Sequence, residues 1–242
     1  MTVWNRSNLS VLFCLTSFVC FGHSQTVVVE RDSFLVGTQT VKVPPPTGFV
    51  NAYKKVDSLT KFFDSSADPE ARLLGVLVQT DIAVKLKNNQ RIGTLDFYIE
   101  FFVPKMMLNT EVTPRAFAEF VTKTEKDLDI LINKNHPENE AAKNRVLDSL
   151  QELNGRPANI EIKPPKNLGT IDKQADVFST MVLTDLVTSE GTSHMLGVRS
   201  YVLINKRMLY INTYKRITSE KDIAPFRDFA KIWIAAIIAA NK

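Results

Sequence analysis

The chain has 242 residues, 30 Lys and Arg against 26 Asp and Glu, and only two cysteines. Both cysteines, Cys14 and Cys20, fall within residues 1–24, so disulfide, zinc-finger and thiol redox chemistry are excluded for the remaining 218 residues. Those residues keep 29 basic and 26 acidic side chains. A net charge of only +3 produces no strong field for a polyanion, and we expect no nucleic-acid partner.

The N-terminus has the pattern of a secretory signal peptide over residues 1–24. Arg6 supplies a positive charge, an apolar stretch runs from Leu9 to Phe21, and the small residues Gly22 and Ser24 follow. The apolar stretch is shorter than the roughly 20 residues that a transmembrane helix needs. We therefore predict cleavage after Ser24 and an exported protein, with an uncleaved anchor as the alternative. No Asn-x-Ser/Thr sequon follows the segment, which favours a bacterial periplasm over a eukaryotic secretory route, with an extracellular location as the alternative.

The first elements after this segment are expected to be short. Thr26–Glu30 and Thr38–Val43 are β-branched runs and predict two strands, and Pro44–Pro46 ends the second because proline cannot donate to a strand ladder. A short helix is expected from about Asp57, whose side chain can cap the following amides, and it should end before Pro69.

Two apolar segments predict longer strands. Arg72–Thr80 and Leu95–Val103 are rich in β-branched and aromatic residues, and their length suits strands with at least one buried face. Residues 81–93 between them are polar and predict a turn region.

The middle of the chain predicts two helices. Thr113–Pro114 pairs a capping hydroxyl with proline at the first helical position, and apolar residues then recur at helical spacing as far as Ile132. A second helix follows Pro137 and runs to about Leu153. Together they form a predicted helical insertion over residues 113–155, with a helical hairpin as one possible arrangement.

The last third of the chain predicts an antiparallel meander. Lys163–Lys173 contains two prolines and a glycine, and we interpret it as a surface loop. Three β-rich runs joined by turn residues then follow: Gln174–Ser189, Thr192–Asn205 and Arg207–Ile217. Thr218 or Ser219 caps a long final helix, whose apolar end is too short to span a bilayer.

This order of elements predicts a single α+β domain over residues 25–242. Strands come first, the helical insertion lies in the middle, and the meander and long C-terminal helix close the chain. Such a layout is typical of an antiparallel sheet with helices packed on it.

Three segments of the chain are typical of one known fold: Pro46–Phe49, the strand end Leu209–Ile211, and a terminal helix that carries Phe229, Trp233 and Ala236. Together they resemble the PsbP-like fold, which also occurs in DcrB-type envelope proteins. The resemblance covers the order of elements but not the helical insertion. It implies a small exported accessory protein without an agreed catalytic site, and it transfers no functional residue.

Two local groups could in principle carry chemistry. His136 with Glu138 and Glu140 is a possible set of metal ligands, but a mononuclear site needs three or four converging groups, and acids at a helix start also serve the helix dipole. Ser193 and His194 could form a nucleophile and base, but adjacent strand residues point to opposite faces. We interpret both groups as structural.

Two groups of residues that are dispersed in the sequence could also form a site. Glu100, Asp176 and Asp185 could meet in a cleft as paired carboxylates of a hydrolase, although solvent-facing strand positions explain them as well. A basic aromatic face for a polyanion could arise from Tyr201, Lys206, Arg207, Tyr210, Tyr214, Lys215 and Arg216. Alternation along the strands places about half of these side chains in the core.

The sequence thus predicts no catalytic residue, no cofactor, no cofactor-binding residue and no metal ligand. The expected function is that of an exported, non-enzymatic accessory or binding protein of the cell envelope that acts through contacts with another envelope protein. Two alternatives remain open: a hydrolase with a dispersed carboxylate site, and a carrier of a small ligand in a cavity between sheet and helices.

Overall fold

The computed structural model describes residues 32–242 except 89, 91, 93–94, 133–136 and 155–158. The predicted signal segment, residues 1–24, and the predicted strand Thr26–Glu30 lie outside the described residues.

The main element is an eight-stranded sheet in which neighbouring strands run antiparallel. Its strand order is β3-β4-β5-β10-β9-β8-β6, and β7 also pairs with β8. Two short strands, β1 (Ser33–Val36) and β2 (Gln39–Lys42), form a separate hairpin. The strands of the main sheet are β3 (Phe49–Asn51), β4 (Ala71–Gln79), β5 (Phe97–Pro104), β6 (Glu161–Ile162), β7 (Lys166–Gln174), β8 (Val177–Thr188), β9 (Gly191–Ile204) and β10 (Arg207–Ile217).

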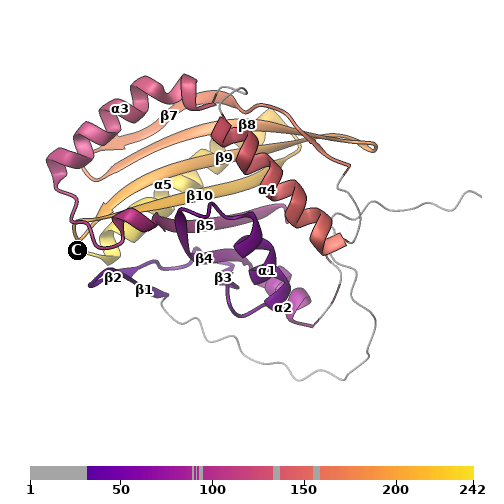
Figure 1. Ribbon diagram of the computed structural model, residues 1–242, viewed down its shortest axis with the longest axis horizontal. Helices are drawn as coiled ribbons and strands as arrows, with labels where there is room; N and C mark the ends of the chain where they lie inside the picture. The colour runs from indigo at the N-terminus through magenta and orange to yellow at the C-terminus, as the bar shows by residue number, and fades with distance from the viewer. Residues whose placement is uncertain (1–31, 89, 91, 93–94, 133–136, 155–158) are drawn as a thin grey trace, which may run out of the picture.

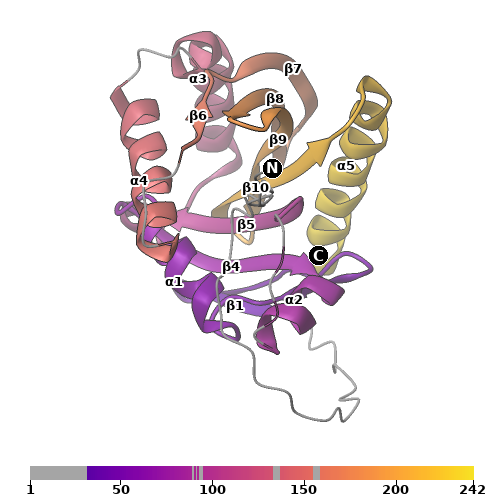
Figure 2. The same cartoon turned by 90° about the vertical axis from the view of Figure 1, so that its right-hand side faces the viewer.

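Helices cover both faces of this curved sheet, as Figures 1 and 2 show from two sides. One face carries the C-terminal helix α5, and the other carries α3 over one part and α1 with α4 over another. The helices are α1 (Asp57–Ser66), α2 (Thr80–Lys87), α3 (Pro114–Ile132), α4 (Pro137–Asn154) and α5 (Ile223–Ala240), with short 3-10 turns η1 (Lys105–Met107) and η2 (Glu220–Asp222). The predicted α+β class with a long C-terminal helix is confirmed.

The face under α5 holds the largest part of the core. Residues of β10 alternate, so that Leu209 and Ile211 point to this face and are almost fully buried with Phe101 and Trp233. The β1–β2 hairpin closes this core at one end. Trp233 Nε1 donates a hydrogen bond of 2.8 Å to the carbonyl of Pro44.

The meander and the positions of the long helices follow the prediction closely. β8, β9 and β10 lie within three residues of their predicted ends, and α3 begins at Pro114 as expected. Ser219 and Asp222 form a capping box at the start of η2, directly before α5.

Four local predictions differ from the structure. The predicted loop Lys163–Lys173 contains most of β7, an edge strand with two bulges. The predicted turn region 81–93 begins with the helix α2. Asp57 is the first residue of α1 and not its cap, since Val56 holds the cap position without a side-chain hydrogen bond. The helices α3 and α4 do not pack along each other over their described residues, because α4 packs on α1 instead.

Candidate functional site

A row of polar side chains crosses the sheet on the face that carries α3 and α4. Strand register aligns Glu100 of β5 with Asn212 of β10, Asn212 with Arg199 of β9, and Arg199 with Thr180 of β8. Directly paired residues of adjacent strands point to the same face. We call Glu100, Asn212, Arg199 and Thr180 the polar row.

Aromatic rings flank the polar row on both sides. On one side, the rings of Tyr98 and Tyr214 stack with centroids 4.9 Å apart. On the other side, the rings of Tyr201 and Tyr210 meet edge to face at 4.8 Å. A β-carbon at Gly197 would lie 3.4 Å from the Tyr214 ring, so this glycine leaves room for the ring to lie beside the polar row.

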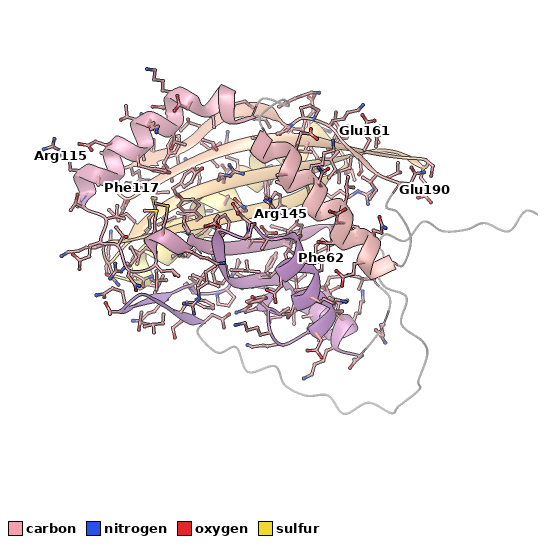
Figure 3. All side chains as sticks on the ribbon, in the orientation of Figure 1. Phe62, Arg115, Phe117, Arg145, Glu161 and Glu190 are labelled. Carbon is pink, nitrogen blue, oxygen red and sulfur yellow. The ribbon has the colours of Figure 1, made fainter. Side chains whose placement is uncertain are left out.

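Helices cover the aromatic groups but leave part of the polar row exposed. Phe120 of α3 contacts the Tyr201 ring at 5.0 Å, and Phe63 of α1 contacts the Tyr98 ring at 5.6 Å. In Figure 3, Phe117 lies under α3 and Phe62 lies where α1 meets α4. Arg199 lies on the strands between these helices and is exposed to solvent.

The Arg199 guanidinium forms no ion pair with a carboxylate of the described residues. Within the described part of the chain, no Asp or Glu forms an ion pair with it at 4.0 Å or less. The protein atoms around the guanidinium partly desolvate it and oppose its charge, but the hydroxyls of Tyr201, Tyr214 and Tyr210 together outweigh that effect and raise the pKa of Arg199 further. The side chain therefore stays cationic at every accessible pH.

Glu100 is the titratable member of the polar row. Burial raises the pKa of its carboxyl to about 7, and the hydrogen bond with Asn212 and the charge of Arg199 only partly offset that rise. Burial also raises the pKa of Tyr98 and of Tyr214 well above the ordinary tyrosine value. Near neutral pH the Glu100 carboxyl thus exchanges a proton while its aromatic neighbours stay neutral.

Asn212 has an unsatisfied acceptor in the middle of the row. The residue is 8% exposed, and its Oδ1 atom has no hydrogen-bond partner among the described residues. A buried amide oxygen without a donor costs about 1–3 kcal/mol. The polar row therefore holds, side by side, an arginine without an ion pair among the described residues and an amide oxygen that is shielded from solvent and accepts no hydrogen bond.

The carboxylates predicted from sequence do not come together. Asp185 lies on the opposite face of the sheet from Glu100, since Met181 and Leu183 of the same strand pack in the core beneath α5. Asp176 lies in the turn between β7 and β8. A hydrolytic pair made of these acids is not assembled.

The structure pairs His194 with an acid that the sequence analysis had not linked to it. His194 Nδ1 lies 2.8 Å from Asp185 Oδ1, and this hydrogen bond is the main cause that lowers the pKa of Asp185. Ser193 precedes His194 in β9 and points to the other face, as predicted. The pair lies toward the free end of the β8–β9 hairpin, whose tip is marked by Glu190 in Figure 3.

The possible metal ligands and the basic aromatic group named in the sequence analysis do not form sites among the described residues either. His136 lies outside the described residues, and Glu140 forms an ion pair of 3.1 Å with Lys143. No cluster of three or more metal-binding side chains occurs among the described residues. Of the basic aromatic group, the three tyrosines share the face of the polar row, whereas Arg207 is buried on the other face.

A hollow of about 680 Å³ lies between α1 and the end of α4. Lys61 and Glu152 line it and form an ion pair of 2.7 Å with each other. Because its side chains carry both signs of charge and pair across it, this hollow shows no preference for a charged ligand.

Arg199 is the residue that sequence reasoning missed. Its position within an apolar stretch of β9, Leu196–Ile204, gave a usable signal, because an arginine among buried strand residues needs a partner or a function. The neighbours that define the site, however, depend on the strand register and could not be derived from spacing.

Comparisons with known proteins give little further information. No family model matches the chain, and no curated protein matches its sequence. A crystal structure of the Saccharomyces cerevisiae Ran-binding protein Mog1p matches 84% of this chain and 87% of its own, with 14% identity and a TM-score of 0.28. A likeness at this score carries no argument. Among the described helices, none combines the length and the apolar character needed to cross a membrane.

Proposed function

We propose that this chain is an exported, non-enzymatic accessory protein of the cell envelope that binds another protein through the polar row. The observation that carries the proposal is the exposed Arg199 between α3 and α4, on a sheet face that these helices otherwise cover. An arginine flanked by aromatic rings is the combination that dominates many protein interfaces.

The openness of this face favours a macromolecule over a small ligand. Binding sites for small molecules enclose roughly 70–90% of the ligand surface. Arg199 is exposed, so its side chain is not enclosed. A partner protein can cover such a face without a closed cavity.

Site-specific photo-crosslinking in intact cells tests this function. A photoreactive residue at Met195, which lies on the same face four residues from Arg199, should give one discrete adduct in the envelope fraction. The same group at Lys123, an exposed position of α3, serves as the matched control. No adduct from Met195, or adducts of equal yield from both positions, would contradict the proposal.

A further inference from the structure

The β1–β2 hairpin is attached to the rest of the molecule mainly through side chains. It forms its own two-stranded sheet, and in the described part of the chain neither strand pairs with the main sheet. Phe34 packs its ring edge to face on Phe101 at 4.7 Å, and near the C-terminus (Figure 1) the amide group of Asn241 bonds to the backbone of Lys42. A two-stranded hairpin is only marginally stable by itself in water, so its closed position depends on these contacts.

A buried arginine lies under the turn of this hairpin. Arg207 is 4% exposed, and its Nε and Nη1 atoms have no hydrogen-bond partner among the described residues. Its Nη2 atom lies 3.5 Å from the hydroxyl of Thr38, at the outer limit of a hydrogen bond, and no carboxylate of the described residues pairs with it at 4.0 Å or less. Gly37 covers the same group, since a β-carbon there would lie 3.4 Å from Nη2.

The closed hairpin therefore removes Arg207 from water without replacing its hydrogen bonds. Water satisfies all five N–H groups of an exposed guanidinium, whereas those on Nε and Nη1 are unsatisfied under the hairpin. A charge that is buried without a counter-charge opposes the arrangement that buries it. Apolar packing favours the closed hairpin, and the desolvated arginine favours its release.

We propose that the β1–β2 hairpin is a lid that opens as one unit while the main sheet stays folded, and that hydration of Arg207 favours the open form. Opening breaks the hydrogen bonds between Asn241 and Lys42 and uncovers the side of the Phe101 ring that contacts Phe34. The uncovered surface lies on the face that carries α5, opposite the polar row, so this inference is independent of the proposed function.

Native-state hydrogen exchange, followed by ¹⁵N NMR over a series of low urea concentrations, tests the lid. The amide of Val43, which donates to the carbonyl of Asp32 at 2.8 Å, reports on the base of the hairpin, and the amides of β9 and β10 report on the main sheet. We expect Val43 to exchange at least about tenfold faster than the main-sheet amides and with a weaker urea dependence, because local opening exposes less surface than global unfolding.

Three variants test what sets the opening. Arg207→Met removes the charge and the N–H groups but keeps an apolar side chain, and it should slow the exchange of Val43 at least about tenfold. Lys206→Met is the matched control and should leave the rate unchanged, because Lys206 is exposed and pairs with Glu111 at 3.3 Å. Asn241→Ala removes a contact of the closed form and should speed the exchange.

Each part of the inference has its own contrary outcome. Exchange of Val43 at the rate and with the urea dependence of the β10 amides would overturn the lid. Local opening that is equally fast, or faster, in Arg207→Met would leave the lid intact and overturn the role of Arg207. Unchanged amide spectra of the main sheet establish that each variant is folded.

Discussion

Glu100 combines a role in the polar row with a cost to the fold. Its carboxyl has a pKa of about 7 in the folded protein, against an ordinary value of 4.5. The folded state therefore holds a proton that the unfolded state has lost between these two values. The contribution of Glu100 to the free energy of unfolding is therefore most favourable below about pH 4.5. It falls as the pH rises to about 7 and then stays constant. The difference of about 2.5 pH units corresponds to about 3 kcal/mol.

Replacing Glu100 with Gln should remove this loss. The E100Q protein is expected to be more stable than the original at pH 8, by up to about 3 kcal/mol, and nearly equal to it at pH 4.5. The groups that act on Glu100, namely Arg199, Tyr98 and Tyr214, do not titrate in this range, so the change belongs to Glu100. Urea denaturation at a series of pH values measures it, and parallel pH profiles for the two proteins would refute the assignment.

Gly75 is a second single residue on which the stability of the fold depends, because there is no space for a β-carbon at this position. A β-carbon there would overlap the ring of Phe101, which is fully buried and cannot turn aside. Gly75 also follows the irregular register between β4 and β5. Gly75→Ala is expected to destabilise the fold by about 2 kcal/mol, the usual scale of overpacking.

A substitution of Phe101, the residue that the added β-carbon would contact, supplies the control for Gly75→Ala. In a chain that already carries Phe101→Leu, the smaller side chain leaves space, so the added methyl group should cost clearly less. Thermal unfolding of the four proteins in this cycle measures the difference. An equal cost of Gly75→Ala in both backgrounds would locate the strain elsewhere.

At the scale of elements, α5 and the β1–β2 hairpin are joined by apolar packing, in which Val36 and Val41 are buried with Trp233, and by hydrogen bonds at the end of the hairpin. The hydrogen bond of Trp233 to Pro44 joins a helix and a segment 189 positions apart. Trp233→Phe keeps a large aromatic ring but removes the donor. We expect a loss of about 2 kcal/mol in unfolding free energy, from the missing hydrogen bond and the smaller buried ring, measured by circular dichroism in urea.

The neighbouring residue is a suitable reference for this change. Ile232 is 72% exposed, so Ile232→Ala should alter the unfolding midpoint much less than Trp233→Phe does. A larger effect at Ile232 would mean that the outer surface of α5 is covered in solution.

Elements with a strong local signal were predicted well, and elements that depend on pairing were not. The meander and α3 carry alternation, turn residues and caps in their own sequence. β7 is an edge strand whose polar, bulged sequence resembles a loop, and it becomes a strand only because β8 supplies hydrogen bonds. The polar row could not be predicted from the sequence for the same reason. Glu100 and Arg199 are 99 positions apart in the chain, and only the register of three strands brings them into one row.

At the scale of the whole molecule, the proposed export makes a direct prediction. N-terminal sequencing of the protein recovered from the periplasm should begin at Gln25. Arginine at both Leu12 and Leu15 interrupts the apolar stretch and should leave the full-length precursor in the cytoplasm. A mature protein that starts elsewhere would correct the cleavage site, and unchanged export of the arginine variant would refute the signal peptide.

The contact between the two ends of the domain constrains when the chain can fold. Asn241 exchanges hydrogen bonds of 2.9 and 2.7 Å with the backbone of Lys42 across 199 positions. The strand next to β5 in the sheet, β10, also comes from the last part of the chain. While those residues are still being synthesised or threaded through a channel, β4 and β5 have an open edge and an uncovered apolar surface. The native structure of this domain therefore forms only after residues 207–241 are available to pair with β5 and to cover its apolar surface.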